Sequence, residues 1–335
     1  MRISDKFSMH LVLIVWLMTG SLAAQNPNLG SAGAQFLKIP IGARSAALGG
    51  AVTGMSEDAT ALFWNPAGIA QNHNQSVHFS YIPWMQYFDI TAFSYTLRLK
   101  DKGTLGFHAL TVGMEKMQIT TEKQPEGTGQ YFDAQDLEMG LSYARQLTDR
   151  FSMGFSAKLL HQRIWNETAN GLAFDVGTHY SINFQNLVLA MSMKNFGSDL
   201  KMEGPELLTV VDENDQFPNR LIQTMKQTEA YPLPLSFQFG VAADLLNTAF
   251  LHSRLAIDAV HLNDNAERIN IGLESTFARQ FIIRGGYSLN DDEAKGSLGL
   301  GLNQKLGEMI VKLDYAFVMH ERLEDTRFMS LSLIF

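Results

Sequence analysis

From about Val77 to its C-terminus, the sequence alternates between two kinds of residue with a period of two, in segments separated by turn residues. In the last segment Met329, Leu331, Leu333 and Phe335 share one face, and serines lie on the other. Such alternation is typical of β-strands. The face opposite the apolar residues is small or charged in these segments, as in the lumen of a membrane barrel, whose outer face must be apolar. We therefore predict an all-β protein, a transmembrane antiparallel β-barrel; a soluble β-sandwich, which also alternates, is the alternative.

The connections between these segments also alternate in length. Links after even-numbered segments are mostly tight, as at Thr148-Asp149 and Arg279-Gln280, although the link at 245–252 is longer. Links after odd-numbered segments are mostly longer, and the longest runs from Phe196 to Pro232. Outer-membrane barrels have short periplasmic turns, long outer loops and an even strand number, so we expect about 14 strands with both termini in the periplasm. The predicted strands are 76–82, 89–99, 103–113, 136–147, 150–161, 171–181, 187–195, 234–244, 253–261, 268–277, 281–288, 297–303, 308–318 and 326–335.

The N-terminus has the features of a secretory signal peptide. Arg2 and Lys6 precede an apolar run at 11–18, and small residues follow up to Ala24. The run is shorter than the roughly 20 residues of a membrane-spanning helix. The sequence has no cysteine, which excludes a lipid anchor at the cleavage site, disulfides and thiolate metal sites. We therefore expect residues 1–24 to be removed during export to the outer membrane.

Residues 25–75 do not alternate and are rich in glycine and alanine. Small residues permit close approach of one backbone to another. Asp58 can cap a short helix, which Asn65-Pro66 would end. The segment is too compact to be a linker, so we predict an N-terminal plug, or hatch, at 25–75 and a transmembrane barrel at 76–335.

Two stretches of this segment resemble the opening of the PorV/PorQ family of outer-membrane proteins, within the wider FadL-like class. They are Gly-Ala-Arg-Ser-Ala-Ala-Leu-Gly-Gly-Ala at 42–51 and Asp-Ala-Thr-Ala-Leu-Phe-Trp-Asn-Pro-Ala-Gly at 58–68. The resemblance implies a 14-stranded FadL-like barrel with an N-terminal hatch. It also implies a role in type IX secretion, in which such proteins bind the C-terminal signal domains of cargo and pass them to the attachment machinery. The hatch motif that it identifies consists of Arg44, Gly49, Asp58, Trp64, Asn65, Pro66 and Ala67.

Charged residues of both signs are expected to face the lumen. Mixed signs in one lumen favour mutual pairing that fixes the hatch or narrows the channel, over a path for substrate. These expected lumen charges are Arg98, Lys158, Asp175, Asp258, Glu274, Arg284, Lys312 and Asp314.

Signals for catalysis or cofactor binding are missing from the sequence. No two histidines have the spacing of a metal site on one element, and there is no Gly-x-Ser-x-Gly elbow. Gly299-Leu300-Gly301 lacks the third glycine of a nucleotide-binding loop. The net charge of −8 argues against a nucleic-acid partner. We expect no enzymatic activity, no cofactor and no metal.

The expected partners follow from this placement. Phe335, a terminal aromatic residue on the lipid face, resembles the signal read by the barrel assembly machinery, and outer-membrane lipid surrounds the barrel. Trp84 lies with other aromatic residues at an outer strand end, as an interfacial belt or, alternatively, a docking rim. Two functions remain open. One is secretion, with cargo C-terminal domains and other type IX components docking on the outer loops, including the acidic ones at 212–215 and 291–293; the other is FadL-like transport of hydrophobic small molecules.

Overall fold

A computed structural model describes residues 28–72, 74–212, 221–291 and 294–335. The predicted signal peptide, 1–24, lies outside these residues, as do most of the acidic groups at 212–215 and 291–293. Among the described helices, none has the length and apolar character needed to cross a membrane.

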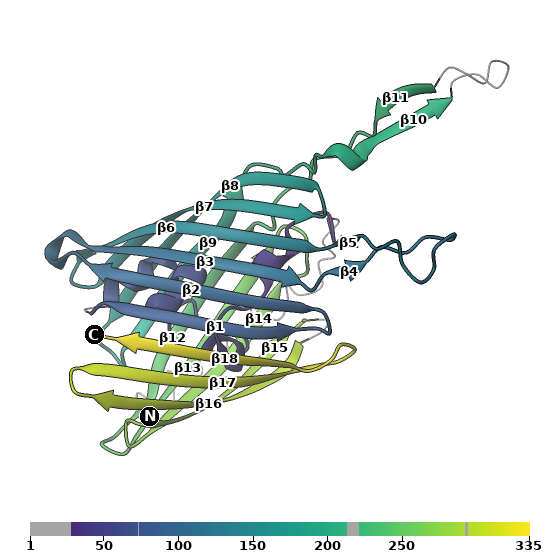
Figure 1. Cartoon of the computed structure of the whole chain (residues 1–335). Coiled ribbons are helices and arrows are strands. Elements are labelled where there is room, and N and C mark those ends of the chain that lie inside the picture. The colour runs from purple at the N-terminus through teal and green to yellow at the C-terminus, as the bar shows by residue number, and fades with distance from the viewer. Residues whose placement is uncertain (1–27, 73, 213–220, 292–293) are drawn as a thin grey trace.

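Fourteen antiparallel strands form one closed barrel, which confirms the predicted fold class and strand number (Figure 1). Consecutive barrel strands are neighbours, and the first pairs with the last. The long link at 245–252 shrinks to three residues because the flanking strands extend past a register shift between Asp244 and Leu246. The barrel strands are β1 (Ser76–Trp84), β2 (Phe88–Arg98), β3 (Thr104–Met114), β6 (Ala134–Thr148), β7 (Phe151–Ile164), β8 (Glu167–Ile182), β9 (Leu187–Gly197), β12 (Ser236–Asn247), β13 (Leu251–Leu262), β14 (Arg268–Phe277), β15 (Phe281–Leu289), β16 (Ala294–Leu306), β17 (Met309–His320) and β18 (Thr326–Ile334).

Two small hairpins lie in links where the sequence pattern indicated only loops. One pairs β4 (Met117–Gln118) with β5 (Tyr131–Phe132), and the other pairs β10 (Leu208–Asp212) with β11 (Leu221–Met225). Both project beyond the barrel at the same end, which also carries the long links (Figure 1). Because long loops lie outside in outer-membrane barrels, we refer to this end as the outer end and to the short-turn end as the periplasmic end.

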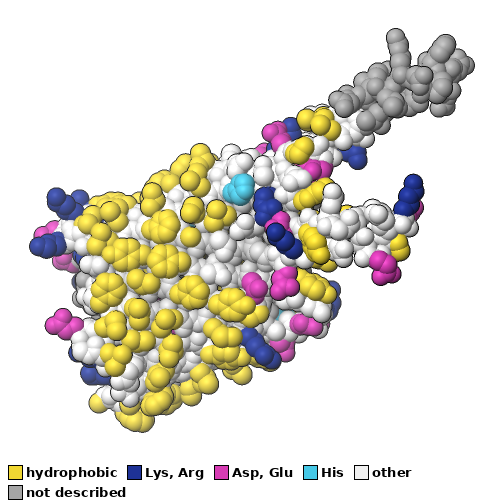
Figure 2. All heavy atoms as spheres, in the orientation of Figure 1, with side chains coloured by type: hydrophobic (Ala, Val, Ile, Leu, Met, Phe, Trp, Pro, Cys, Tyr) yellow, Lys and Arg dark blue, Asp and Glu magenta, His cyan; other side chains and the backbone are white. Residues whose placement is uncertain are grey.

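The outer face of the barrel is apolar and the inner face is polar and small. Leu141 and Leu159 are 68% and 61% exposed, whereas Ser142 and Ser156, on the opposite face of the same strands, are buried. Hydrophobic side chains cover the barrel wall in Figure 2, and Lys, Arg, Asp and Glu are concentrated at its two ends. This distribution is that of a wall facing lipid, with charged groups at the two interfaces with water.

Short helices fill the lumen. They are η1 (Gln35–Lys38), α2 (Ala43–Ala47), η2 (Ala59–Phe63) and η3 (Pro66–Gln71); η4 (Lys100–Lys102) and η5 (Pro205–Leu207) lie in links outside it. The hatch, as we name residues 28–75, starts at the outer end, where the backbone N–H of Gly30 donates to the carbonyl of Asp264 (3.0 Å). It finishes at the periplasmic end, where Gln75 exchanges two backbone hydrogen bonds with Phe335. The main hydrophobic cluster lies between hatch and wall, and includes Leu48, Val52, Ile82 and Phe328.

Candidate functional site

A chain of buried ion pairs joins α2 to three barrel strands. Arg44 donates two hydrogen bonds to Glu274 of β14 (2.8 and 2.9 Å), and Glu274 also accepts one from Arg284 of β15 (2.7 Å). Arg284 donates in turn to Asp314 of β17 (2.6 Å). Burial by itself would lower the pKa of Arg44, but the adjoining Glu274 carboxylate raises it above the ordinary value. Four residues of alternating sign therefore connect the hatch to the wall.

The start of η2 is held to the same side of the barrel. Asp58 is the N-cap residue and accepts from the backbone N–H of Thr60 (3.0 Å), while Lys312 of β17 lies 3.5 Å from its other carboxylate oxygen. Burial alone would raise the pKa of Asp58, but Lys312 and Arg44 hold it well below its usual range. Asp58 is therefore a charged cap in a buried place.

The backbone between α2 and η2 binds a carboxylate of the wall. Asp258 of β13 is fully buried, and one of its oxygens accepts from the backbone N–H groups of Val52 and Thr53, each at 2.8 Å. Gly240 of β12 leaves room for this arrangement, because a Cβ there would lie 2.6 Å from Asp258 and 2.8 Å from Thr53.

The opposite side of the hatch is held without ion pairs between described residues of η3 and the wall. Asn65, the N-cap of η3, accepts from the N–H of Ala67 (3.1 Å) and donates to the carbonyl of Thr178 in β8 (3.0 Å). A side chain at Gly154 of β7 or Gly177 of β8 would collide with Pro66 or Asn65. The wall therefore leaves room for η3 because glycines occupy these two strand positions. Near the periplasmic end, Arg98 donates to the carbonyl of Ala70 (3.0 Å).

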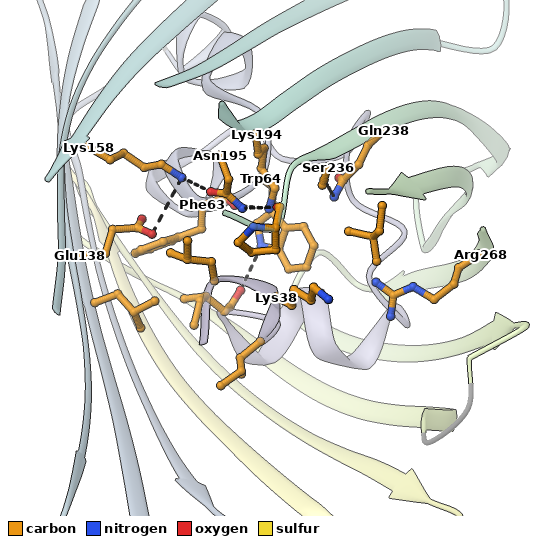
Figure 3. Close-up of a pocket in the computed structure, with 16 residues that line it drawn as sticks. Lys38, Phe63, Trp64, Glu138, Lys158, Lys194, Asn195, Ser236, Gln238 and Arg268 are labelled. Atoms are coloured by element: carbon orange, nitrogen blue, oxygen red, sulfur yellow. Dashed lines mark hydrogen bonds and ion pairs between the residues drawn. The ribbon is translucent and has the colours of Figure 1, made fainter. Parts of the chain in front are cut away.

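A second charged cluster lies beside Phe63 and Trp64 (Figure 3). Lys158 lies 3.0 Å from Asp175 and 3.9 Å from Glu138, and Glu138 is 3.0 Å from Nε2 of His108. Lys194 donates to the carbonyl of Phe63 (3.0 Å) and lies 4.9 Å above the Trp64 ring. This contact combines a cation–π interaction with capping of η2, because the C-terminal carbonyls of a helix attract cations. The space enclosed here is about 40 Å³, enough for a few water molecules at most.

A larger cavity of about 300 Å³ lies between the hatch and strands β14 to β18 at the outer end. Its floor includes Gly49, Gly50 and Trp64 of the hatch. At its edge, Lys38 pairs with Asp264 (2.7 Å) and Arg268 with Asp291 (2.7 Å). The apolar lining comes mainly from Ile39, Pro40, Trp84, Val318, Leu323 and Phe328.

The structure brings the expected lumen charges into contact with the hatch or with one another. It also shows two further charged residues in the lumen that were not among those expected. Glu138 and Lys194 face the lumen, and the alternation within their strands would have placed them there. Asn195 accepts a hydrogen bond from Lys158, although its neighbour Lys194 already points inward. A register shift between β8 and β9 and a left-handed backbone (φ 64°) at Asn195 allow both. The alternation pattern carries no signal for this bulge.

The remaining predicted residues are placed as follows. Gly49 has a left-handed backbone (φ 62°) and lies against Tyr287, and the Trp64 indole donates to the carbonyl of Ile41 (3.0 Å). Trp84 lines the outer cavity and contacts His320 edge to face, while Phe335 is half exposed at the periplasmic end. Among the described residues, no group of three or more His, Asp or Glu side chains could hold a metal ion.

Comparison with known proteins supports both the barrel and the hatch motif. The family model described as type IX secretion system protein PorV matches residues 22–178, which include the hatch and the barrel as far as β8. This match confirms the resemblance that the hatch motif predicted. No curated protein matches the sequence.

Solved structures with the same fold are FadL-like barrels. A FadL homologue of Pseudomonas aeruginosa is 10% identical, with a TM-score of 0.56 over 89% of this chain and 98% of that one. The toluene transporter TbuX of Ralstonia pickettii is 10% identical, with a TM-score of 0.54 over 88% of this chain and 96% of that one. The toluene transporter TodX of P. putida is 12% identical, with a TM-score of 0.54 over 88% and 97%. At these identities the likeness shows the fold alone.

Proposed function

Because this chain is a FadL-like outer-membrane barrel with PorV-family sequence over residues 22–178, we propose that it is a non-enzymatic component of type IX secretion that binds protein cargo at the cell surface. The family match carries this proposal. The matched stretch contains the whole hatch and the β4–β5 hairpin, so it extends beyond a generic strand pattern.

The attachment of the hatch supports a docking role over a conducting one. The hatch is tied to both sides of the wall, by Arg44 and Asp58 on one side and by Asn65 on the other. Opening a channel through the lumen would separate these contacts. Cargo that is handled on the outer surface requires no such opening.

The β10–β11 hairpin is the element that we propose to contact cargo. It forms its own two-stranded sheet and projects from the outer end (Figure 1). Leu208 and Met225 are paired at its base and are 53% and 65% exposed. Exposed apolar side chains on a projecting element are typical of a contact surface.

The test is deletion of the gene in its host, followed by proteomics of the secreted and surface fractions. We expect loss of the proteins that carry type IX C-terminal signal domains, and restoration by the intact gene. An unchanged secretome in the deletion strain would rule the proposal out.

A hairpin variant locates the contact. Residues 208–225 can be replaced by a two-residue turn, because the N–H of Lys226 already donates to the carbonyl of Leu207 (2.7 Å). The matched control removes 120–129 from the other hairpin, where the N–H of Ile119 donates to the carbonyl of Gln130 (2.9 Å). We expect only the first variant to fail in restoring secretion. Equal restoration by both would remove the β10–β11 hairpin from the proposal.

The outer cavity favours a second candidate function, transport of hydrophobic small molecules. Its lining is mainly apolar, and a volume of about 300 Å³ is at the lower end of small-molecule sites. Two of the structural neighbours are named as toluene transporters. Uptake of labelled toluene and of a labelled fatty acid by the deletion strain and its parent tests this candidate. If the deletion strain and its parent take up each compound equally, the transport function is rejected.

A further inference from the structure

Two neighbouring turns at the periplasmic end of the barrel carry basic residues. The β2–β3 turn contains Lys100 and Lys102, and the end of β6 and the turn after it contain Arg145 and Arg150. Because β3 pairs with β6, the two turns are adjacent around the barrel. We name these four residues the basic rim. All four are exposed, and within the part of the chain that the structure describes none of their side chains has an ion-pair partner.

The charge of these turns is opposite to that of the longest outer link. Residues 99–103 and 145–150 together contain four Lys or Arg and two Asp residues, a net charge of +2. The outer link at 198–235 contains seven Asp or Glu and three Lys or Arg residues. Figure 2 shows Lys and Arg side chains at the periplasmic end, directly beside the apolar wall. The basic rim therefore borders the surface that faces lipid.

The position of Arg145 on its strand places it on the lipid-facing side. Residues two apart on a strand share a face, so Arg145 points outwards with Tyr143, which is 42% exposed. Its partner on β7 is Met153, which is 41% exposed. The Tyr143 hydroxyl donates to the carbonyl of Lys102 (2.6 Å), and tyrosine in such a place is typical of the membrane interface. The Arg145 guanidinium thus lies at the level of phospholipid headgroups.

A cavity of about 250 Å³ lies between the two turns. A Cβ on Gly103 would lie 2.5 Å from the carbonyl oxygen of Ala144, so this glycine allows the turns to approach each other. Arg145 and Thr148 are exposed, so the cavity opens at the protein surface and offers donors there. The lining includes Arg98, Asp101, Gly103, Arg145, Thr148 and Asp149.

From this arrangement we infer that the basic rim binds the headgroup phosphate of an anionic phospholipid in the periplasmic leaflet of the outer membrane. Arg145 donates to the phosphate oxygens, which a guanidinium can bind through two parallel hydrogen bonds. The acyl chains of this lipid lie against the wall beside Tyr143 and Met153. Because Arg145 shares its face with residues that contact lipid, the nearest anion outside the protein is a lipid phosphate.

The net positive charge favours an anionic lipid over a zwitterionic one, since each Lys or Arg near an anionic membrane surface strengthens binding about five-fold. Asp101 and Asp149 offset part of this charge. The inference goes beyond secretion and depends only on the placement of the barrel in the outer membrane. An unchanged secretome in the deletion strain therefore leaves it intact.

The test is native mass spectrometry of the folded protein, released from detergent micelles that contain equal amounts of phosphatidylglycerol and phosphatidylethanolamine. We expect the wild type to retain phosphatidylglycerol preferentially. K102Q/R145Q should lower the ratio of retained phosphatidylglycerol to phosphatidylethanolamine by about five-fold for each charge removed. Migration of unheated samples in SDS gels shows that each variant is folded.

The matched control is R279Q/K305Q. It removes the same charge from exposed positions on the β14–β15 and β16–β17 turns, which are not adjacent to the basic rim. We expect this control to keep the wild-type ratio. D149N removes a negative charge from the cavity lining and should raise the ratio.

Three outcomes would overturn the inference. Equal retention of the two lipids by the wild type would show that the basic rim does not select an anionic lipid. An equal fall in the ratio for both double variants would replace the site with a general attraction of the whole periplasmic end. Displacement of the lipid by excess soluble glycerol phosphate would show that the lipid is not the required occupant.

Discussion

The hatch is held on its two sides by different physical means. Towards β14 and β17, Arg44 and Asp58 form ion pairs with Glu274 and Lys312 of the wall. Towards β7 and β8, η3 contacts the wall through the amide of Asn65 and through the space left by Gly154 and Gly177. Attachment on the first side therefore depends on ion pairs. Attachment on the second side depends on wall residues small enough to leave room for η3.

This difference has consequences for stability. Two charges buried together contribute little net stability, but a single charge left without its partner is strongly destabilising. Close packing against a glycine does not depend on charge, but an added methyl group overfills the space and destabilises the fold. The two sides should therefore respond to different substitutions.

The largest effect is expected for Glu274→Gln, which leaves Arg44 and Arg284 facing each other without their shared carboxylate. We expect the free energy of unfolding to fall by about 3–5 kcal/mol. Urea unfolding in lipid vesicles, followed by tryptophan fluorescence, measures it. Glu308→Gln, at an exposed turn position, is the control and should change stability by less than about 0.5 kcal/mol. Equal effects of the two variants would show that the ion-pair chain does not hold the hatch.

The size-dependent side is tested by Gly154→Ala. The added Cβ meets the backbone of Pro66, which belongs to a packed helix and has little room to move. We expect a loss of about 1–3 kcal/mol in the same unfolding assay. Gly285→Ala is the matched control, because its nearest neighbour, a Leu298 methyl, would be 3.8 Å away. If Gly154→Ala and Gly285→Ala are equally stable, close packing against Pro66 is not the reason for a glycine at position 154.

A smaller loss is expected for Asn65→Ala. The substitution removes the cap of η3 and leaves the carbonyl of Thr178 without this donor. The expected cost is about 1–2 kcal/mol. Asn247→Ala, at an exposed strand end, controls for the loss of an amide as such. If Asn65→Ala unfolds as the wild type does, the Asn65 amide does not contribute to the attachment of the hatch to the wall.

The smallest effect concerns pH. The pKa of Asp58 is depressed in the folded protein by Lys312 and Arg44 against the opposing effect of burial. Its charge therefore stabilises the fold fully above the unfolded carboxyl pKa of about 4, and this stabilisation is lost as pH falls through the lower folded value. We expect the deficit of Asp58→Asn relative to wild type to be constant from pH 8 to 5 and to shrink below pH 4. A deficit that changes between pH 8 and 5 would contradict the assignment.

Local pattern was sufficient for the barrel, because a strand with one face in lipid and one in the lumen must alternate. It placed Lys158, Glu274, Arg284 and Asp314 on lumen faces, where the structure has them buried. It did not predict the hairpins at β4–β5 and β10–β11. These hairpins are short, and none of their strand residues whose burial the structure describes is buried, so they have no inner face to give a hydrophobic periodicity.

Alternation, link lengths and the hatch motif were thus enough to predict the barrel, its 14 strands, the polarity of its two faces and the family to which the motif is similar. Only the tertiary structure shows which lumen charges pair, that the β9 bulge turns the Asn195 side chain inward beside Lys194, and that the first described residues, from Asn28, lie at the outer end. The physical reason is distance along the chain. Arg44 and Glu274 are 230 residues apart, and their contact depends on the register of the whole barrel and the path of the hatch through it, which no local pattern encodes.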